Sequence, residues 1–175
     1  VPGLGAVLYT SDVDSDFQQL CRLNLRTGVQ EVLLPALKWG VEALSISPNG
    51  KQAALVINEA GFGQLRLLDL KTTELSAPAN LPRGLVSDLH WHTNGKELGF
   101  AVSAADSADD VFSLNTNSGQ LTRWTRRVSA VHGSSSIDVV RSFDGEVVPI
   151  VYWLPDSQRF DEPVRRPVLL MLPFA

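Results

Sequence analysis

The sequence is poor in the residues that mark several classes of protein. It has one cysteine, Cys21, which excludes an internal disulfide and suits a reducing compartment, so we expect a cytoplasmic location. No apolar run approaches the roughly 18 residues that span a bilayer. Basic residues are outnumbered, with 15 Lys and Arg against 19 Asp and Glu, so neither nucleic acid nor a membrane is an expected partner.

Helical periodicity is also missing up to about residue 130, so the chain is predicted to be all-β there. What the chain does have is a set of repeated sequence motifs. Residues 49–51 (NGK) return 45 positions later as residues 94–96, and residues 25–28 (LRTG) return as 70–73 (LKTT) and, altered, as 114–119 (LNTNSG). A period of about 40–45 residues built from short strands is typical of propeller blades.

Each unit follows the same order of short strands, with a hairpin between the first two. The Asn49-Gly50 and Asn94-Gly95 pairs are expected to supply the positive φ angles of tight hairpins. The first unit lacks the strand before residues 6–9. Strands are predicted at 44–47, 53–57, 65–70 and 74–75 in the second unit, and at 89–92, 98–102, 111–114 and 120–124 in the third.

The fold prediction is therefore a partial β-propeller of about three four-stranded antiparallel blades, WD40-like or TolB-like. The blades are placed at about 1–40, 41–84 and 85–130. Three blades do not close a ring of ordinary curvature, which leaves exposed sheet edges. Further upstream blades, self-association, or capping by the later strands would cover these edges, and the truncated first unit favours upstream blades. We interpret the chain as a piece of a longer protein.

The motif SPNGK (47–51), followed by an apolar strand and LLDLKT (67–72), resembles propeller repeats of the prolyl oligopeptidase and acylaminoacyl peptidase family. TolB-like propellers share this pattern. Residues 139–155 (VVRSFDGEVVPIVYWLP) are similar to the segment where those peptidases leave the propeller and begin their α/β-hydrolase domain. Residues 166–172 (RPVLLML) are similar to the strand that leads to their oxyanion loop. The resemblance implies a linker at 131–137 and the N-terminal strands of a truncated hydrolase-like domain at 138–175.

The sequence departs from that family at its last residues. Family members continue into His-Gly-Gly-Pro, whereas this chain reads Pro173-Phe174-Ala175 and stops. No Gly-x-Ser-x-Gly nucleophile elbow is present, so the chain alone is expected to be inactive, and no catalytic residue is predicted in it. Residues 134–136 (SSS) are interpreted as a flexible connector. A degenerate peptidase without a triad is a further alternative, because Pro173 stands where histidine is expected.

Three other groups of residues resemble binding sites, and ordinary structural roles are favoured for all of them. His90 and His92 have the spacing of metal ligands, with His132 as the only other histidine. The alternation Asp12-x-Asp14-x-Asp16 is similar to the start of a calcium loop but lacks its glycine and glutamate. Acidic residues recur in the third unit, and both acidic loops are expected on one rim. The members of this second loop are Asp106, Asp109 and Asp110.

The remaining chemistry is also assigned to structure. Arg123, Arg126 and Arg127 surround Trp124 where a blade closes, and a structural or linker role is favoured over a binding patch. Cys21 is expected to be buried as a small apolar residue. No metal site and no cofactor are predicted.

Two functions from different classes follow. The first, implied by the resemblance, is the non-catalytic propeller part of a serine peptidase, which gates the access of peptides to a catalytic domain absent from this chain. The second is a stand-alone propeller module that binds proteins or peptides and has no enzymatic activity. The expected partners are a peptide substrate, through the missing catalytic domain, or further copies of the chain that complete the propeller.

Overall fold

The computed structural model describes residues 5–82, 84–103, 109–126, 133–155 and 168–169. These residues form strands, turns and loops and contain no helix, so no described helix could cross a membrane. The strands are β1 (Ala6–Ser11), β2 (Gln19–Asn24), β3 (Gln30–Val32), β4 (Val41–Ile46), β5 (Gln52–Glu59), β6 (Phe62–Asp69), β7 (Leu75–Ser76), β8 (Leu85–Trp91), β9 (Glu97–Ser103), β10 (Asp110–Asn115), β11 (Leu121–Arg123), β12 (Gly133–Arg141) and β13 (Val147–Pro155).

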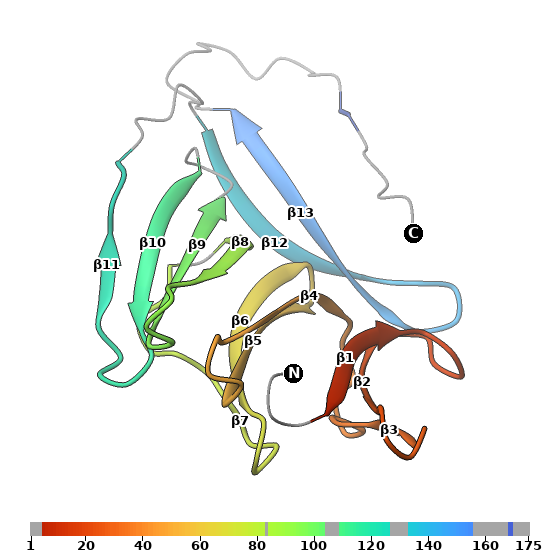
Figure 1. Cartoon of the computed structure of the whole chain (residues 1–175). Coiled ribbons are helices and arrows are strands. Elements are labelled where there is room, and N and C mark those ends of the chain that lie inside the picture. The colour runs from red at the N-terminus through yellow and green to blue at the C-terminus, as the bar shows by residue number, and fades with distance from the viewer. Residues whose placement is uncertain (1–4, 83, 104–108, 127–132, 156–167, 170–175) are drawn as a thin grey trace, which may run out of the picture.

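Strands β1 to β11 form three antiparallel sheets, in the orders β1-β2-β3, β4-β5-β6-β7 and β8-β9-β10-β11. The sheets follow one another around an axis, as the blades of a propeller do (Figure 1). The first sheet has three strands because no described strand pairs with the inner side of β1. The prediction of an all-β partial propeller is confirmed.

The blades are held together by two hydrophobic cores, one at each junction between sheets. Leu20 and Val41 belong to the core between the first and second sheets, and Phe100 and Phe112 belong to the core between the second and third. The rings of Phe100 and Phe112 are stacked, with their centroids 5.9 Å apart. The central sheet has neighbours on both faces, which explains why residues 53–57 of β5 are all buried.

The hairpins at the inner edges of the second and third blades differ in one detail from the prediction. Gly50 and Gly95 have φ angles of 67° and 64°, but Asn49 and Asn94 are not among the residues of positive φ. The Gly50 N–H instead donates to the Ser47 carbonyl at 2.8 Å, closing a four-residue turn that needs left-handed backbone only at its glycine. The asparagine serves through its side chain: Asn49 Oδ1 accepts the Lys51 N–H at 3.0 Å.

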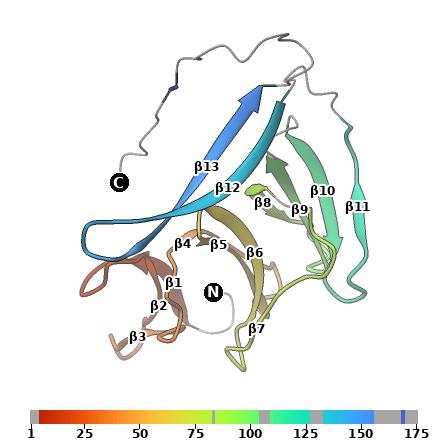
Figure 2. The ribbon, with the colours of Figure 1, turned by 180° about the vertical axis from the view of Figure 1, so that it is seen from behind.

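The two strands β12 and β13 form a separate hairpin with nine paired positions. In Figures 1 and 2 it extends from the third sheet across to the first, so it spans one end of the propeller. The connector predicted at 131–137 is wrong in part, because β12 begins at Gly133 and residues 134–136 pair with β13. The expected strand at 166–172 lies mostly outside the described residues, and Val168 and Leu169 belong to no strand.

Candidate functional site: the rim beneath the β12–β13 hairpin

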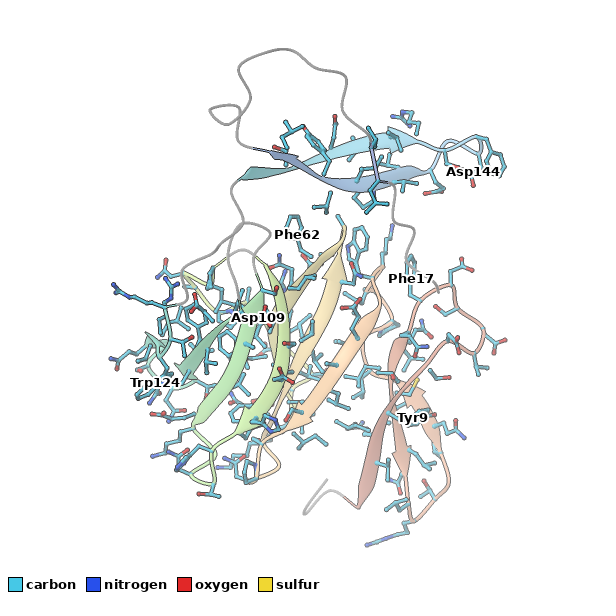
Figure 3. The ribbon with its side chains drawn as sticks, turned by 90° about the horizontal axis from the view of Figure 1, so that it is seen from above. Tyr9, Phe17, Phe62, Asp109, Trp124 and Asp144 are labelled. Atoms are coloured by element: carbon cyan, nitrogen blue, oxygen red, sulfur yellow. The ribbon has the colours of Figure 1, made fainter. Side chains whose placement is uncertain are left out.

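One end of the propeller faces the β12–β13 hairpin, and we call its described loop residues 12–18, 60–61 and 109 the hairpin-side rim. Figure 3 shows Phe17, Phe62 and Asp109 at this end of the blades, on the side where the hairpin lies. The loops belong together because β1, β5 and β9 all run toward this end before their chains turn back. The expectation that the two acidic loops share one rim is confirmed for Asp12, Asp14 and Asp16 and for Asp109.

The exposed charge of this rim is acidic. Asp12, Asp14 and Asp16 lie in the β1–β2 loop, and Asp109 lies before β10; all four are exposed. The turns at the opposite end of the blades carry the basic side chains of Arg26, Lys51, Lys71 and Lys96. The aspartates of the β1–β2 loop and Asp109 are thus the acidic part of this end, which also carries the exposed Lys38 in the loop that enters β4.

The β1–β2 loop is organised by short-range hydrogen bonds. The Ser15 N–H donates to the Asp12 carbonyl at 3.1 Å, and Asp14 adopts a positive φ of 61°. The Phe17 N–H donates to Ser15 Oγ at 3.1 Å. These bonds shape the loop, and its Phe17 side chain is 42% exposed on the rim.

The second blade contributes the turn between β5 and β6 to this rim, and side-chain hydrogen bonds and an ion pair stabilise that turn. Asn58 Oδ1 accepts the Gly61 N–H at 2.9 Å, and Asn58 Nδ2 donates to Glu42 Oε1 at 2.6 Å. Arg66 Nη2 pairs with Glu59 Oε1, also at 2.6 Å. These bonds connect β4, β5 and β6 and thereby fix the start of β6, where Phe62 lies.

The third blade ends at the rim in a buried ionic network. Asp110 is 3% exposed; its Oδ2 pairs with the Arg123 guanidinium and its Oδ1 accepts the Thr125 hydroxyl at 2.9 Å. Thr125 Oγ1 in turn accepts the Val111 N–H at 2.8 Å, and the Arg123 guanidinium lies 5.9 Å from the Phe112 ring centre. Asp110 is therefore a structural residue of β10 rather than part of the acidic loop, and the structural role expected for Arg123 is confirmed.

The candidate metal ligands take other roles in the described residues. His90 lies on β8 and is exposed, while His92 Nδ1 accepts the Asn94 N–H at 3.1 Å in the inner hairpin. Within the described part of the chain, no three His, Cys, Asp or Glu side chains converge as metal ligands. His132, Asp106 and Arg127 lie outside the described residues, and Arg126 is exposed.

Cys21 is buried, as predicted, on the face of the first sheet that looks away from the second. Its neighbour Tyr9 donates its hydroxyl proton to Gln30 Oε1 at 2.7 Å. Desolvation raises the pKa of Tyr9 above its ordinary value, and the adjacent Cys21 adds to the shift. A hollow lined by these residues, Gln19 and Val32 opens on this face of the first sheet.

The sequence reasoning missed the Asp110–Arg123 pair and the Tyr9–Gln30 bond. The first connects the neighbouring strands β10 and β11, whereas the second connects β1 to β3 across the intervening β2, at 13 and 21 residues apart. Neither pair occupies directly opposite positions, since Arg123 faces Phe112 and Tyr9 faces Cys21, so strand register alone would not have identified them.

No protein-family model and no curated protein sequence matches this chain. Solved structures do match it. Puromycin hydrolase superposes with a TM-score of 0.72 at 19% identity, over 90% of this chain and 26% of its own. Prolyl oligopeptidase B from Galerina marginata, bound to a 35-residue substrate, gives a TM-score of 0.70 at 10% identity, over 84% and 22% of the two chains. TolB from Acinetobacter baumannii gives 0.56 at 20% identity, over 86% and 41%.

The chain has the fold of a prolyl oligopeptidase-type propeller. TolB has the same type of propeller, so the likeness establishes the architecture of the blades and not an activity. The chain spans about a quarter of the length of the peptidases that it matches. The resemblance found in the SPNGK and LLDLKT motifs is thus confirmed at the level of fold.

Proposed function

We propose that this chain is the non-catalytic propeller portion of a serine peptidase of the prolyl oligopeptidase type. In this proposal the catalytic domain begins at the β12–β13 hairpin and continues outside residues 1–175. The likeness to puromycin hydrolase and prolyl oligopeptidases supports the propeller assignment. The β12–β13 hairpin is the observation that supports the second part of the proposal, that a catalytic domain begins there.

The hairpin exposes apolar side chains along both strands. Val139, Val140, Ile150, Tyr152 and Leu154 are each at least 36% exposed. Along β13, Val147 and Val151 lie on one face, while Val148 and Ile150 lie on the other, because side chains alternate along a strand. An isolated two-stranded hairpin is marginal in water, and apolar residues on both faces are typical of strands covered on both sides. Further structure of the same protein would supply that cover.

The position of the hairpin suggests how the propeller would act. A catalytic domain that begins there would lie over the hairpin-side rim, because the hairpin spans that end of the blades (Figure 3). A peptide would then pass the rim, with its exposed Phe17 and its aspartates, before it reached the catalytic serine. We propose that the propeller gates access in this way, and that extended, short peptides are admitted in preference to folded proteins. Cys21 as a single buried thiol supports a cytoplasmic location.

The first test is the intact mass of the native gene product. The proposal expects a mass several times the 19.1 kDa of this chain. A product of about 19.1 kDa would overturn the peptidase assignment and favour a binding module.

The gating role has a separate test. The purified whole product is assayed with one cleavable sequence placed in a short peptide and in an exposed loop of a folded protein. We expect cleavage of the peptide only. Equal rates with both substrates would contradict gating while leaving the peptidase assignment intact.

A further inference from the structure

Large aromatic side chains gather on the hairpin-side rim. Phe17 is 42% and Trp39 is 39% exposed, and Phe62, at the start of β6, is half-buried. Aromatic groups contribute a large part of the binding energy of protein surfaces, and several of them exposed at one place are typical of a binding site. We call these three residues the aromatic rim.

Phe17 and Trp39 come from segments that adjoin each other. The Val41 N–H donates to the Gln18 carbonyl at 2.8 Å, which joins the strand that follows Trp39 to the loop that contains Phe17. A Cβ added at Gly40 would lie 3.8 Å from the Gln18 backbone nitrogen, so the two segments are in van der Waals contact. Both aromatic residues are therefore held at the junction between the first and second blades.

Phe62 is connected to the same junction. The Asn58 N–H donates to the Gly40 carbonyl at 2.9 Å, so the end of β5 adjoins the loop that contains Trp39. Asn58 Oδ1 also accepts a backbone N–H of the turn that leads into Phe62. Figure 3 shows Phe17 and Phe62 on the side of the blades where the hairpin lies. The aromatic rim is thus one surface to which two blades contribute.

Exposed carboxylates accompany the aromatic rim. Three of them share the β1–β2 loop with Phe17, and the exposed Lys38 beside Trp39 adds a single positive charge. The carboxylates outnumber this charge, and among the described residues they have no hydrogen-bond or ion-pair partner. They belong to Asp12, Asp14, Asp16 and Asp109. Aromatic faces and carboxylates both attract cations, so the surface favours a positively charged ligand.

We infer that the aromatic rim binds cationic peptides in which arginine or lysine stands beside large apolar residues. The apolar side chains pack on the aromatic rings, and the positive groups lie over the rings or beside the aspartates. This inference rests on the proposed function for the passage of peptides along the rim. It deepens that function by naming the class of peptide that the propeller selects.

A cationic peptide fits this surface better than a further domain does. A domain seated directly on the aromatic rim would remove its carboxylates from water, and an unpaired carboxylate is costly to desolvate. An extended peptide covers the rings with its side chains and leaves the carboxylates hydrated beside its own charges. The β12–β13 hairpin has the wrong charge to occupy the rim, because it carries Asp138, Asp144 and Glu146 against Arg141.

The inference is tested by peptide binding to the whole gene product, treated with a fluorophosphonate to stop cleavage by any reactive serine. Three short fluorescein-labelled peptides are compared by fluorescence anisotropy. One alternates phenylalanine with arginine, one has glutamine in place of arginine, and one has alanine in place of phenylalanine. We expect the phenylalanine–arginine peptide to bind at least about tenfold more tightly than either of the others at low salt. Equal affinities for the three peptides would overturn the inference.

Variants of the aromatic residues locate the binding surface. We expect Phe17→Ala and Trp39→Ala each to weaken binding of the phenylalanine–arginine peptide at least about fivefold, because exposed aromatic anchors dominate such surfaces. Leu25→Ala is the matched control, since Leu25 is 63% exposed at the opposite end of the first blade, and it should leave binding unchanged. Binding that neither aromatic variant weakens would overturn the inference and show that the rest of the polypeptide covers the rim.

The electrostatic part is tested by salt titration. We expect the double variant Asp14→Asn, Asp16→Asn to bind the phenylalanine–arginine peptide more weakly and with a smaller salt dependence, because salt screens exposed charges. Glu74→Gln, in an exposed turn at the opposite end, should keep the salt dependence of the wild type. The same salt dependence in the double variant as in the wild type would contradict the role of the aspartates.

Failure of this inference can be distinguished from failure of the proposed function. Selective binding of the phenylalanine–arginine peptide by a product without a reactive serine would support the aromatic rim and contradict the peptidase assignment. Equal binding of the three peptides by a product with one labelled serine would overturn the inference and leave the peptidase assignment intact.

Discussion

At the scale of single residues, a threonine occupies a backbone position that glycine occupies in two equivalent turns. Gly28, Thr73 and Gly119 have φ angles of 70°, 59° and 73°. Each donates its N–H to the first residue of its turn, at 2.8–2.9 Å. The left-handed region of backbone conformation is costly for a β-branched side chain. The turn of the second blade, which contains Thr73, is therefore strained, whereas the equivalent turns of the first and third blades are not.

Replacing this threonine should therefore stabilise the protein. We expect Thr73→Gly to raise the free energy of unfolding by about 1 kcal/mol. Glycine relieves the backbone strain of the folded state, and this gain is only partly offset by the greater conformational entropy that glycine gives the unfolded chain. Gly119→Thr is the matched control and should lower it by a similar amount. Urea unfolding of the variants measures both changes. A less stable Thr73→Gly variant would show that the Thr73 side chain contributes more than its backbone costs.

Asp69 should make stability depend on pH at the acid end. Hydrogen bonds from the backbone N–H groups of Thr72 and Lys71 lower the pKa of its carboxyl below the ordinary 3.8. Because the pKa of Asp69 is lower in the folded than in the unfolded state, its ionised carboxyl stabilises the fold at pH values above 3.8. This stabilisation is lost as the pH falls through the folded-state pKa of Asp69.

The equivalent turns provide the control for this prediction, because Asn24 and Asn115 accept the same two backbone bonds without a titratable group. We expect Asp69→Asn to flatten the acid limb of a plot of unfolding free energy against pH, and Asn115→Asp to steepen it. Superimposable acid limbs for wild type and Asp69→Asn would contradict the assignment. Asp144, whose pKa is also lowered, remains in every variant.

At the scale of elements, the end of the third blade depends on the buried carboxylate of Asp110. Removing it leaves the Arg123 guanidinium and the Thr125 hydroxyl without their shared partner. Because Arg123 remains partly solvated, we expect Asp110→Ala to cost about 2 kcal/mol, below the range for fully buried pairs. Asp109→Ala, at the exposed neighbouring position, should change little. Equal effects of the two substitutions in denaturant unfolding would show that the network is not stabilising.

The inner hairpin of the third blade should tolerate no side chain at Gly95. A Cβ there would lie 2.7 Å from Asn49 Nδ2, in addition to the backbone strain of a φ of 64°. Gly119→Ala has similar strain but an open surrounding, so it isolates the backbone effect. We expect Gly119→Ala to cost about 1 kcal/mol and Gly95→Ala clearly more. Equal costs would show that the Asn49 amide moves aside freely.

At the scale of the whole molecule, the blades were predictable from the sequence because the same turn motifs and apolar strands recur in each repeat unit. The strand predicted at 53–57 is all apolar in the sequence, and all five of its residues are buried in the structure. Two features were not predictable. The pairing of residues 134–136 within β12 depends on a long-range partner, β13, which small serines do not reveal. Asp110 looked like a loop residue because its burial depends on Arg123 across the sheet.

The hairpin-side rim was only partly predictable for a related reason. The acidic residues were found from composition, and strand order placed them at one end. Phe17 shares the β1–β2 loop with Asp16, so the same strand order places it at this end. Which end of the blades faces the β12–β13 hairpin (Figure 3) is contained in no local pattern.

The central claim, that these residues are the propeller portion of a serine peptidase, is tested most directly by labelling the whole gene product with a fluorophosphonate and mapping the modified residue. The account predicts one reactive serine, located outside residues 1–175 in a Gly-x-Ser-x-Gly elbow. A product that remains unlabelled in its native state, or a label on a serine within residues 1–175, would contradict it.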